Sequence, residues 1–592
     1  MKQTRPTPSA RALTLLAAMI AAVFAVTSCA PSLPTDGPVG TSEIDALGEP
    51  ETYFQPDPPV PGAEPEEIIR GFMQAHAGHS NDYAVAREYM TESAAQNWQP
   101  GGRTTIYQQE PSFLPGGDPE SDEAHYQVQL QVHAVINPDG TMTTMGGTTN
   151  EQFDIQLEEV DGEWRISEAP NGKMLDISIF NQVYSAQTLY FYDPQLRYAV
   201  PDLRFFVRRP GMPAEIVSRM LEGPAPWLEP AVVSAFPEGA SLSRSAVPID
   251  NQVATVDLDA AVQEASPRER LLMSHQLNMA LSQLPDVREV ELTVGDSELE
   301  VPAPDELPED QQLNIESNPS TTSIQVGIQD DQLVRQNGIT TLSIGGLPDL
   351  SSFQPQAPAA PRETTEEVFA FLNGSADELY LVRPNENAEL VLEAEGLIRP
   401  SMDNFGWTWT ASHDEDQGAT IQVVAHDETV HLSATQVPAD WLEQRSVSSL
   451  RIAQDGTRAV LVVDDAGQQT LYLASVIRDS DGTPRGLGQP VPLESSQGME
   501  EVRWSNSNEV IVWDSYDGAE DTSDPQRYPL RIGFNGEREF IEPAISWLLN
   551  ISAGEGQSNI YAETVDVPFW NLSGSDWESS EDVEVRDLAF PG

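Results

Sequence analysis

The chain has 592 residues, which suggests about three or four domains, and an apolar fraction of 39% is adequate for folded cores. Its 94 acidic residues outnumber 31 lysines and arginines, giving a formal net charge of −63. Such a chain repels phosphate backbones and anionic lipid headgroups, so we expect no nucleic-acid partner and no electrostatic attachment to a membrane. A solvated surface that favours solubility accounts for the acidity.

The N-terminal segment has the pattern of an export signal. Lys2, Arg5 and Arg11 precede the apolar run Ala12–Val26, and this run is shorter than the roughly 20 residues that a membrane-spanning helix needs. No later apolar run is long enough to span a bilayer. We therefore predict a signal peptide at residues 1–28, with the mature chain on the side to which it is exported.

Cys29 follows this segment directly and is the one cysteine in the chain. The sequence Val26-Thr27-Ser28-Cys29 resembles a bacterial lipobox, in which the cysteine becomes the mature N-terminus and carries a diacylglycerol thioether and an N-acyl chain. Two or more acyl chains hold a protein stably at a membrane. We predict a lipid anchor at Cys29; the alternative is an ordinary signal peptide with a cysteine near the cut by chance.

Residues 29–61 are rich in proline and glycine and are typical of an extended tether. In the first predicted domain, residues 62–182, a helix runs from Pro65 through His76 and a second helical stretch from Asn81 to Trp98. Apolar and polar residues then alternate over His125–Ile136, and a turn at Asp161-Gly162 indicates a hairpin. Helices on a curved antiparallel sheet resemble a nuclear-transport-factor-2-like domain, a type of module that often binds rather than catalyses.

Residues 183–304 are predicted to form a second α+β domain. One helix begins at Pro213, and another begins behind the capping box Ser266–Glu269. Strands are expected at Val253–Leu258 and Val287–Val294. The segments that resemble the GerMN domain of exported sporulation and germination proteins are Leu189–Asp193, Ala254–Leu258 and Gln276–Val294. That resemblance implies no catalytic residues.

Residues 305–320 are predicted to be a linker, and residues 321–592 to be all-β. Short apolar runs alternate there with turn dipeptides such as Asp455-Gly456, Asp481-Gly482 and Asp517-Gly518; the runs are Leu379–Val382, Leu390–Leu392, Gln422–Ala425, Val430–Leu432, Ala459–Val463, Leu471–Ala474, Val510–Trp513 and Asn559–Ala562. This length suits a β-propeller of about six blades, with a pair of sandwiches as the alternative. The predicted fold class is two small α+β domains followed by a β-propeller-like domain.

The order of these parts resembles the actinobacterial LpqB lipoprotein family. Three shorter segments add to the resemblance: Pro400–Thr410, Leu450–Arg458 and Leu588–Gly592. The resemblance implies a lipid-anchored protein on the extracytoplasmic face of the cell membrane. It also implies a partnership with a two-component sensor kinase of the MtrB type and its response regulator MtrA, which link the state of the cell wall to division and osmotic response.

No catalytic, cofactor or metal site is predicted. The sequence has no His-Glu-x-x-His, Gly-x-Ser-x-Gly, phosphate-loop or dinucleotide motif. His76 and His79 stand three apart on an expected helix, as zinc ligands can, but no third ligand has suitable spacing, so we interpret them as structural. Asp479–Gly482 and Asp514–Asp524 could hold Ca²⁺ through clustered oxygens, although solvated turns are the favoured interpretation.

Two hypotheses for function remain. The leading one is a non-enzymatic accessory protein that binds the extracytoplasmic domain of a membrane sensor kinase. The alternative is a glycan-binding protein or carbohydrate-active enzyme that uses the propeller mouth. The candidate sugar contacts are Trp407, Trp409, Trp504 and Trp513, and their competing interpretation is packing in the blade cores.

Overall fold

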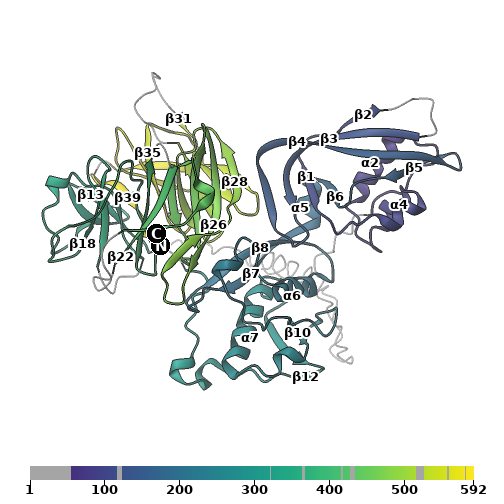
Figure 1. Ribbon diagram of the computed structural model, residues 1–592, viewed down its shortest axis with the longest axis horizontal. Helices are drawn as coiled ribbons and strands as arrows, with labels where there is room; N and C mark the ends of the chain where they lie inside the picture. Colours follow the sequence, from purple (N-terminus) through teal and green to yellow (C-terminus); the bar gives the residue numbers. More distant parts are fainter. Residues whose placement is uncertain are drawn as a thin grey trace, which may run out of the picture. The chain divides into compact units, whose positions relative to one another are not determined.

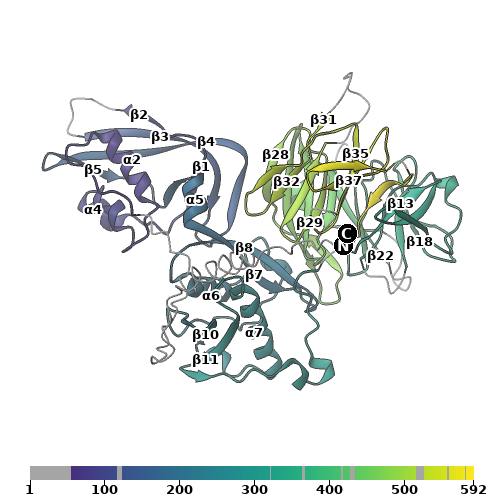
Figure 2. The same cartoon turned by 180° about the vertical axis from the view of Figure 1, so that it is seen from behind.

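The computed structural model describes residues 55–116, 123–319, 322–362, 367–414, 418–426, 434–514, 526–556, 559–580 and 582–592 (Figures 1 and 2). All of these residues belong to one compact unit. The lipobox, the tether up to residue 54 and the Asp517-Gly518 turn lie outside the described residues, as do Val430–Leu432.

The first domain packs three helices on a curved sheet. Its helices are α2 (Pro65–Ala75), α3 (Ala84–Glu88) and α4 (Glu92–Asn97). The sheet has the order β5-β4-β3-β1-β6, with β2 paired to β3, and its strands are β1 (Thr104–Tyr107), β2 (Ser112–Gly116), β3 (Glu123–Ile136), β4 (Met142–Val160), β5 (Glu163–Glu168) and β6 (Lys173–Asp176). The apolar stripe of α2 is buried against the alternating apolar side chains of β3 and β4.

Two helix predictions need correction in this domain. Helix α2 ends at Ala75, so His76 is its C-cap and His79 lies beyond it, not on the same helix. The stretch from Asn81 to Trp98 contains two short helices, since Asn81, Asp82 and Tyr83 all adopt positive φ before α3 and Thr91 caps α4. Local helical spacing did not reveal these breaks.

The second domain has a hairpin and a small mixed sheet. Helix α5 (Ile177–Val183) leads into the paired strands β7 (Tyr184–Tyr192) and β8 (Ala199–Val207). The remaining elements are α6 (Met212–Glu222), η1 (Glu229–Ala231), β9 (Ile249–Asp250), β10 (Val253–Leu258), η2 (Ala260–Val262), α7 (Pro267–Leu281), β11 (Glu289–Val294) and β12 (Ser297–Glu298). Strands β10 and β11 are parallel, and α7, which begins at the expected Ser266 capping box, connects them.

The predicted linker is partly structured. It contains η3 (Pro304–Glu306) and η4 (Glu309–Gln311), and Glu316 then runs beside the start of β8. The backbone N–H of Ala199 donates to the Glu316 carbonyl at 2.9 Å, and the Glu316 N–H donates to the Arg197 carbonyl at 2.9 Å. This end of the segment is thereby fixed to the second domain.

The described residues of the third domain form six antiparallel sheets of four or five strands, in agreement with the expected number of blades. The first blade contains β15 (Thr340–Ser343), β14 (Gln332–Asn337), β13 (Ile324–Gln329) and β39 (Arg586–Ala589), and the second contains β16 (Gln356–Ala359), β17 (Phe369–Leu372), β18 (Glu378–Val382) and β19 (Glu389–Glu393). The third contains β20 (Ser401–Met402), β21 (Trp407–Asp414), β22 (Gly418–Ala425) and β23 (Thr435–Val437), and the fourth contains β24 (Ser446–Ile452), β25 (Arg458–Asp465), β26 (Gln468–Arg478) and β27 (Pro484–Leu487), with β28 (Val491–Ser496) on β26. The fifth contains β29 (Glu501–Asn506), β30 (Glu509–Trp513), β32 (Leu530–Gly533) and β33 (Arg538–Phe540), and the sixth contains β35 (Leu548–Ala553), β36 (Ile560–Thr564), β37 (Trp570–Ser573) and β38 (Asp576–Ser579). A further pair is β31 (Gln526–Arg527) with β34 (Ile545–Ser546), and two short helices are η5 (Ser351–Phe353) and η6 (Asp440–Leu442).

The last strand of the chain completes the first blade. Figure 1 shows β39, in yellow, beside β13, in teal, and the two strands pair antiparallel. The ends of the domain therefore meet in one sheet, which closes the ring of blades and leaves no open edge between the last blade and the first.

Candidate functional site

The anchor residue predicted from sequence, Cys29, lies outside the described residues. Within the described ranges, no helix is both long enough and apolar enough to cross a membrane. The candidate sites in the described residues lie in the folded domains, and the first of them is at the centre of the propeller.

A network of buried charges joins the inner strands of the propeller. Arg399 lies 2.7 Å from Asp587 of β39, and its guanidinium is also 3.5 Å from Glu501 of β29. Glu501 accepts a hydrogen bond of 3.0 Å from Arg503 and lies 3.8 Å from Arg451 of β24. These contacts connect blades that are far apart in the sequence.

The electrostatics of this network follow from burial and pairing. Burial opposes ionisation of Glu501, but Arg503, Arg399 and Arg451 outweigh it and hold its pKa below the ordinary value. Burial and the neighbouring Asp587 together raise the pKa of Glu563 to about 7. Breaking a buried pair of this kind leaves an uncompensated charge, so the network serves to hold the blades together.

Two further buried aspartates, Asp455 and Asp403, form several hydrogen bonds in the third and fourth blades. Asp455 follows β24, accepts the backbone N–H of Thr457 at 2.9 Å, and binds Arg458 through Nε at 2.9 Å and Nη2 at 2.6 Å. Asp403 follows β20 and accepts from Trp409 Nε1 at 2.7 Å and from Arg478 Nη2 at 2.5 Å. Both carboxylates are buried and occupied by internal donors, so neither is available as an acid, a base or a ligand.

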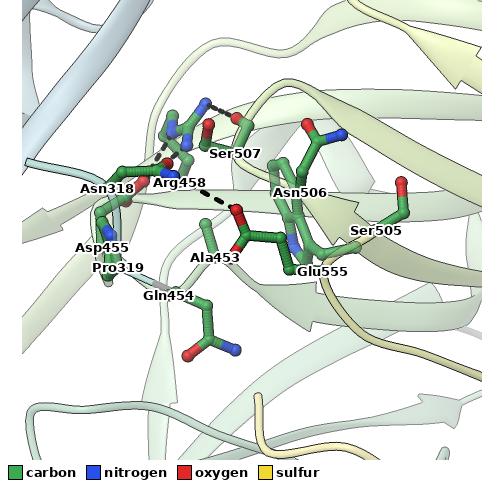
Figure 3. A pocket seen from close by; sticks show the side chains of 11 residues that line it. Asn318, Pro319, Ala453, Gln454, Asp455, Arg458, Ser505, Asn506, Ser507 and Glu555 are labelled. Atoms are coloured by element: carbon green, nitrogen blue, oxygen red, sulfur yellow. Dashed lines mark hydrogen bonds and ion pairs between the residues drawn. The ribbon is translucent and has the colours of Figure 1, made fainter. Parts of the chain in front are cut away.

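The loops behind these inner strands line a small open pocket of about 20 Å³, on the measure by which one water needs about 10–15 Å³ (Figure 3). They follow β24, β29 and β35 and are joined by Asn318 and Pro319 of the linker segment. Asn318 donates to Glu555 at 3.3 Å across this pocket, and Arg458 donates to the Ser507 carbonyl at 2.7 Å. The polar groups at the pocket thus bond to one another and to the linker.

The candidate tryptophans pack in the blades. Trp409 is fully buried, and Trp513 is 3% exposed. Trp407 packs against the core cluster of the third and fourth blades, and Trp504 donates through Nε1 to the Arg451 carbonyl at 3.1 Å. Trp504 also lies under the guanidinium of Arg458, 5.2 Å from its ring centroid. Trp407, Trp409 and Trp513 thus fit the core-packing interpretation, whereas Trp504 also lines the pocket described above.

The remaining sequence candidates have structural surroundings. His76 is 1% exposed, stacks on Trp98, and accepts the backbone N–H of Met174 on Nδ1 at 3.1 Å. His79 lies 3.2 Å from the Arg208 carbonyl. Asp481 accepts the backbone N–H of Thr483 at 3.0 Å, as a solvated turn requires. Among the described residues no group of three metal-ligating side chains is assembled, and most of Asp514–Asp524 is not described.

Exposed apolar side chains offer a different kind of site. Tyr528 and Phe540 are 50% and 61% exposed and form an edge-to-face pair with centroids 6.3 Å apart. On the first blade, Ile339 and Leu342 are also exposed. Aromatic residues of this kind are enriched at protein interfaces. Sequence reasoning missed them because a single apolar residue between strands, such as Ile339 or Tyr528, or in an edge strand, such as Phe540, has no local pattern that separates it from a core residue.

Comparison with known proteins gives matches along most of the chain. Residues 58–181 match the model "Lipoprotein LpqB, N-terminal domain", residues 188–300 match "Sporulation and spore germination", and residues 331–585 match "Lipoprotein LpqB beta-propeller domain". A solved structure of tandem GerMN domains of the sporulation protein GerM from Bacillus subtilis matches at 16% identity, covering 26% of this chain and 58% of that chain, with a TM-score of 0.18.

Relatives named Lipoprotein LpqB include one from Nocardia farcinica, 36% identical over 211 residues, which cover 36% of this chain and only 34% of that protein. A second, from Mycolicibacterium smegmatis, is 24% identical over 98% of both chains. The name lipoprotein indicates membrane association for these relatives. Because two LpqB domain models match in the right order and relatives extend over nearly the whole length, the chain belongs to the LpqB lipoprotein family.

Proposed function

We propose that this protein is a non-enzymatic accessory protein, anchored through lipidated Cys29 on the extracytoplasmic face of the cell membrane. Its domains bind the extracytoplasmic domain of a two-component sensor kinase of the MtrB type and modulate its signalling through a regulator of the MtrA type. The observation that carries the proposal is the position of Cys29, the only cysteine, at the end of an export signal and ahead of domains whose relatives are lipoproteins.

The character of the folded domains supports a binding role. The buried charges at the propeller centre are paired with one another, and the polar groups of the pocket in Figure 3 are bonded within the protein. Apolar side chains such as Phe540 and Ile339 are exposed instead, where a protein partner can bury them. Three of the four candidate tryptophans pack in the blades, and the fourth, Trp504, lines a pocket of only about 20 Å³, so glycan binding is not proposed.

The anchor is tested by fractionating cells that express the wild-type chain or Cys29→Ser. Each acyl CH₂ contributes about 0.8 kcal/mol to membrane binding, and the acidic body adds no attraction to anionic lipids. We expect the wild-type protein in salt-washed membranes and the variant in the soluble extracytoplasmic fraction. If Cys29→Ser stays with the washed membranes, the anchor lies elsewhere.

The partner is tested by photo-crosslinking in intact membranes. A photoreactive residue is placed singly at four exposed apolar positions spread over the domains, namely Leu114, Val233, Ile339 and Phe540, and adducts are identified by mass spectrometry. The proposal expects the sensor kinase in at least one adduct, and loss of that adduct in cells lacking the kinase. Buried Leu461 is the matched control, at which no adduct should form. Adducts that never contain the kinase contradict the proposed partner.

A further inference from the structure

Lys173 is one of very few lysines in this chain. The chain contains 29 arginines but only two lysines, Lys2 in the export signal and Lys173 at the start of β6. An arginine presents a flat, always-charged fork, whereas a lysine is a compact ammonium whose charge responds to its surroundings. A lysine at this one position in the folded domains therefore points to a local chemical requirement.

The ammonium of Lys173 is buried without an acidic partner. The residue is 7% exposed, and its Nζ donates to the Pro100 carbonyl at 2.7 Å and lies 5.4 Å from the ring centroid of Tyr83. Within the described part of the chain, which is strongly acidic, no carboxylate forms an ion pair with it. Burying an ammonium without an ion-pair partner is costly, and an anion bound beside Nζ would offset that cost.

Lys173 lines a cavity of about 210 Å³ where the first and second domains meet. A single water needs only about 10–15 Å³ on the same measure, so this space is more than ten times larger. Its walls include Thr104, whose Oγ1 lies 3.0 Å from the Tyr184 hydroxyl, and Phe205 of β8. The backbone N–H of Phe205 donates to the Gly140 carbonyl at 2.8 Å, which holds the two domains together at this edge.

The other charges at this cavity are already paired. Arg209 donates to Glu215 at 2.8 Å, and Arg219 donates to Glu222 at 2.6 Å. Asp82 receives a hydrogen bond of 2.5 Å from Arg87. After these pairs are formed, Lys173 is the lining charge of the described chain that forms no ion pair, and Glu215, already paired with Arg209, acts on it only through space. The cavity therefore carries an uncompensated positive charge in a chain whose net charge is −63.

We propose that this cavity binds a small molecule through a carboxylate or phosphate group, with the Lys173 ammonium as the main contact. Tyr83 and the hydrogen-bonded pair Thr104–Tyr184 line the same space, and the Tyr83 hydroxyl and one hydroxyl of that pair can each donate a hydrogen bond to the anion. A charge-assisted hydrogen bond from an ammonium to an oxyanion is stronger than one between neutral groups. None of the exposed apolar positions named for the kinase lines this cavity, so the site is a function additional to the proposed one.

The site predicts a pH dependence of binding. Burial lowers the pKa of Lys173 to about 8, with Glu215 opposing and Arg209 adding to the shift. The anion needs the protonated ammonium, so affinity should be highest below pH 8 and fall as pH rises through that value. The charged or titratable groups that line the cavity beside Lys173 are Asp82, Tyr83, Tyr184, Arg209, Glu215 and Arg219.

The direct test uses the Lys2→Arg full-length chain, in which Lys173 is the only lysine whether or not the N-terminal segment is removed. Biosynthetic labelling with [ε-¹³C]lysine then gives one NMR resonance, which is titrated with inorganic phosphate and separately with acetate. We expect a saturable change with one or both anions, an upward shift of the Lys173 titration midpoint, and no such change with equal ionic strength of chloride. Phosphate alone would place phosphate in the site, and acetate alone a carboxylate.

A variant test checks that the response belongs to this amine. Phosphate or acetate should raise the thermal unfolding temperature of the wild-type chain, and Lys173→Met should weaken that response at least tenfold in anion concentration. Arg485→Met removes an exposed cation elsewhere and should keep the wild-type response. A resonance that responds to neither anion, or that responds equally to chloride, overturns the proposal even if Lys173→Met fails to fold.

Discussion

At the scale of single residues, the propeller is held by carboxylates that meet several donors at once. Asp403 shows this most completely, since it accepts from two backbone N–H groups, from Trp409 and from the guanidinium of Arg478. The carboxylate thereby ties the start of the third blade to a strand of the fourth. Such residues look like any other acid in this sequence, which is why their role is visible only in the structure.

Replacing Asp403 with asparagine should destabilise the chain strongly. The change keeps the shape but leaves the buried Arg478 without its counter-charge and turns an amide N–H₂ toward groups that donate. We expect the free energy of unfolding to fall by about 3–5 kcal/mol, as measured by chemical denaturation. Asp479→Asn is the matched control, because its partner Arg485 is exposed and surface pairs contribute little. Equal denaturation midpoints for the two variants would contradict this role.

Two buried histidines predict how stability changes with acidity. Burial lowers the pKa of His76 to about 3 and that of His426 to about 4. The unfolded chain takes up these protons below about pH 6.5, whereas the folded chain does not until the lower values, so stability falls as the pH drops from 6.5 toward 4. Each histidine contributes up to about 1.4 kcal/mol for each pH unit in that window.

The measurement is the free energy of unfolding between pH 4 and pH 7. His76→Asn and His426→Asn should each make this pH dependence shallower, because each removes one group that takes up a proton on unfolding. A slope unaffected by the two buried substitutions would show that these imidazoles are not held neutral in the folded state.

At the scale of secondary-structure elements, closure of the propeller by β39 is the feature on which the domain depends. The strand lies at the end of the first blade's sheet beside β13, and Gly327 of β13 faces it closely. A β-carbon at Gly327 would overlap the side chains of Val585 and Leu588. Glycine is needed at this position so that the last strand can approach the first.

Gly327→Ala should weaken this closure. Overpacking of this kind typically costs about 1–3 kcal/mol, and we expect a loss of that size in the unfolding free energy of the propeller. Gly345→Ala is the control, since a β-carbon there meets nothing within 4 Å. Amide hydrogen exchange at Arg586–Ala589 should rise in the first variant and not in the second. Unchanged protection of this strand in Gly327→Ala would argue against its role in closure.

Sequence reasoning reached the elements whose signals are local. The capping box at Ser266, the turn at Asp455-Gly456 and the alternation over His125–Ile136 each involve neighbouring residues, and each was recognised. The pairing of β39 with β13 joins opposite ends of a long domain and has no local signal. The wrong placement of His76 and His79 on one helix has a different origin, because Gly78 between them is a local signal for a helix end.

The candidate sites also divide into those with a signal in the sequence and those that only the folded structure reveals. Cys29 and the rarity of lysine can both be read from the sequence by counting, although only the structure shows that Lys173 is buried beside a cavity. The Arg399–Asp587 pair could not be predicted, because many acids and arginines offer equally good partners until the blades are arranged. Exposure of Phe540 likewise depends on its place at the edge of a sheet.

At the scale of the whole molecule, the proposed lipid anchor confines the binding domains to the membrane that holds the sensor kinase. A binding protein that drifts in the extracytoplasmic space meets its partner by diffusion, whereas a tether to the same membrane raises the effective concentration of the binding domains without any new contact. The acidic surface adds no attraction to the bilayer, so a lipid at Cys29 would have to supply this confinement.

The measurement that tests this account most directly is the phosphorylation level of the MtrA-type regulator in living cells. It is compared between cells carrying the wild-type chain, the Cys29→Ser chain at equal abundance, and no chain. We predict that loss of the protein changes the phosphorylation level severalfold and that Cys29→Ser reproduces most of this change, although its folded domains are intact. A regulator phosphorylated to the same level in all three strains would contradict the account.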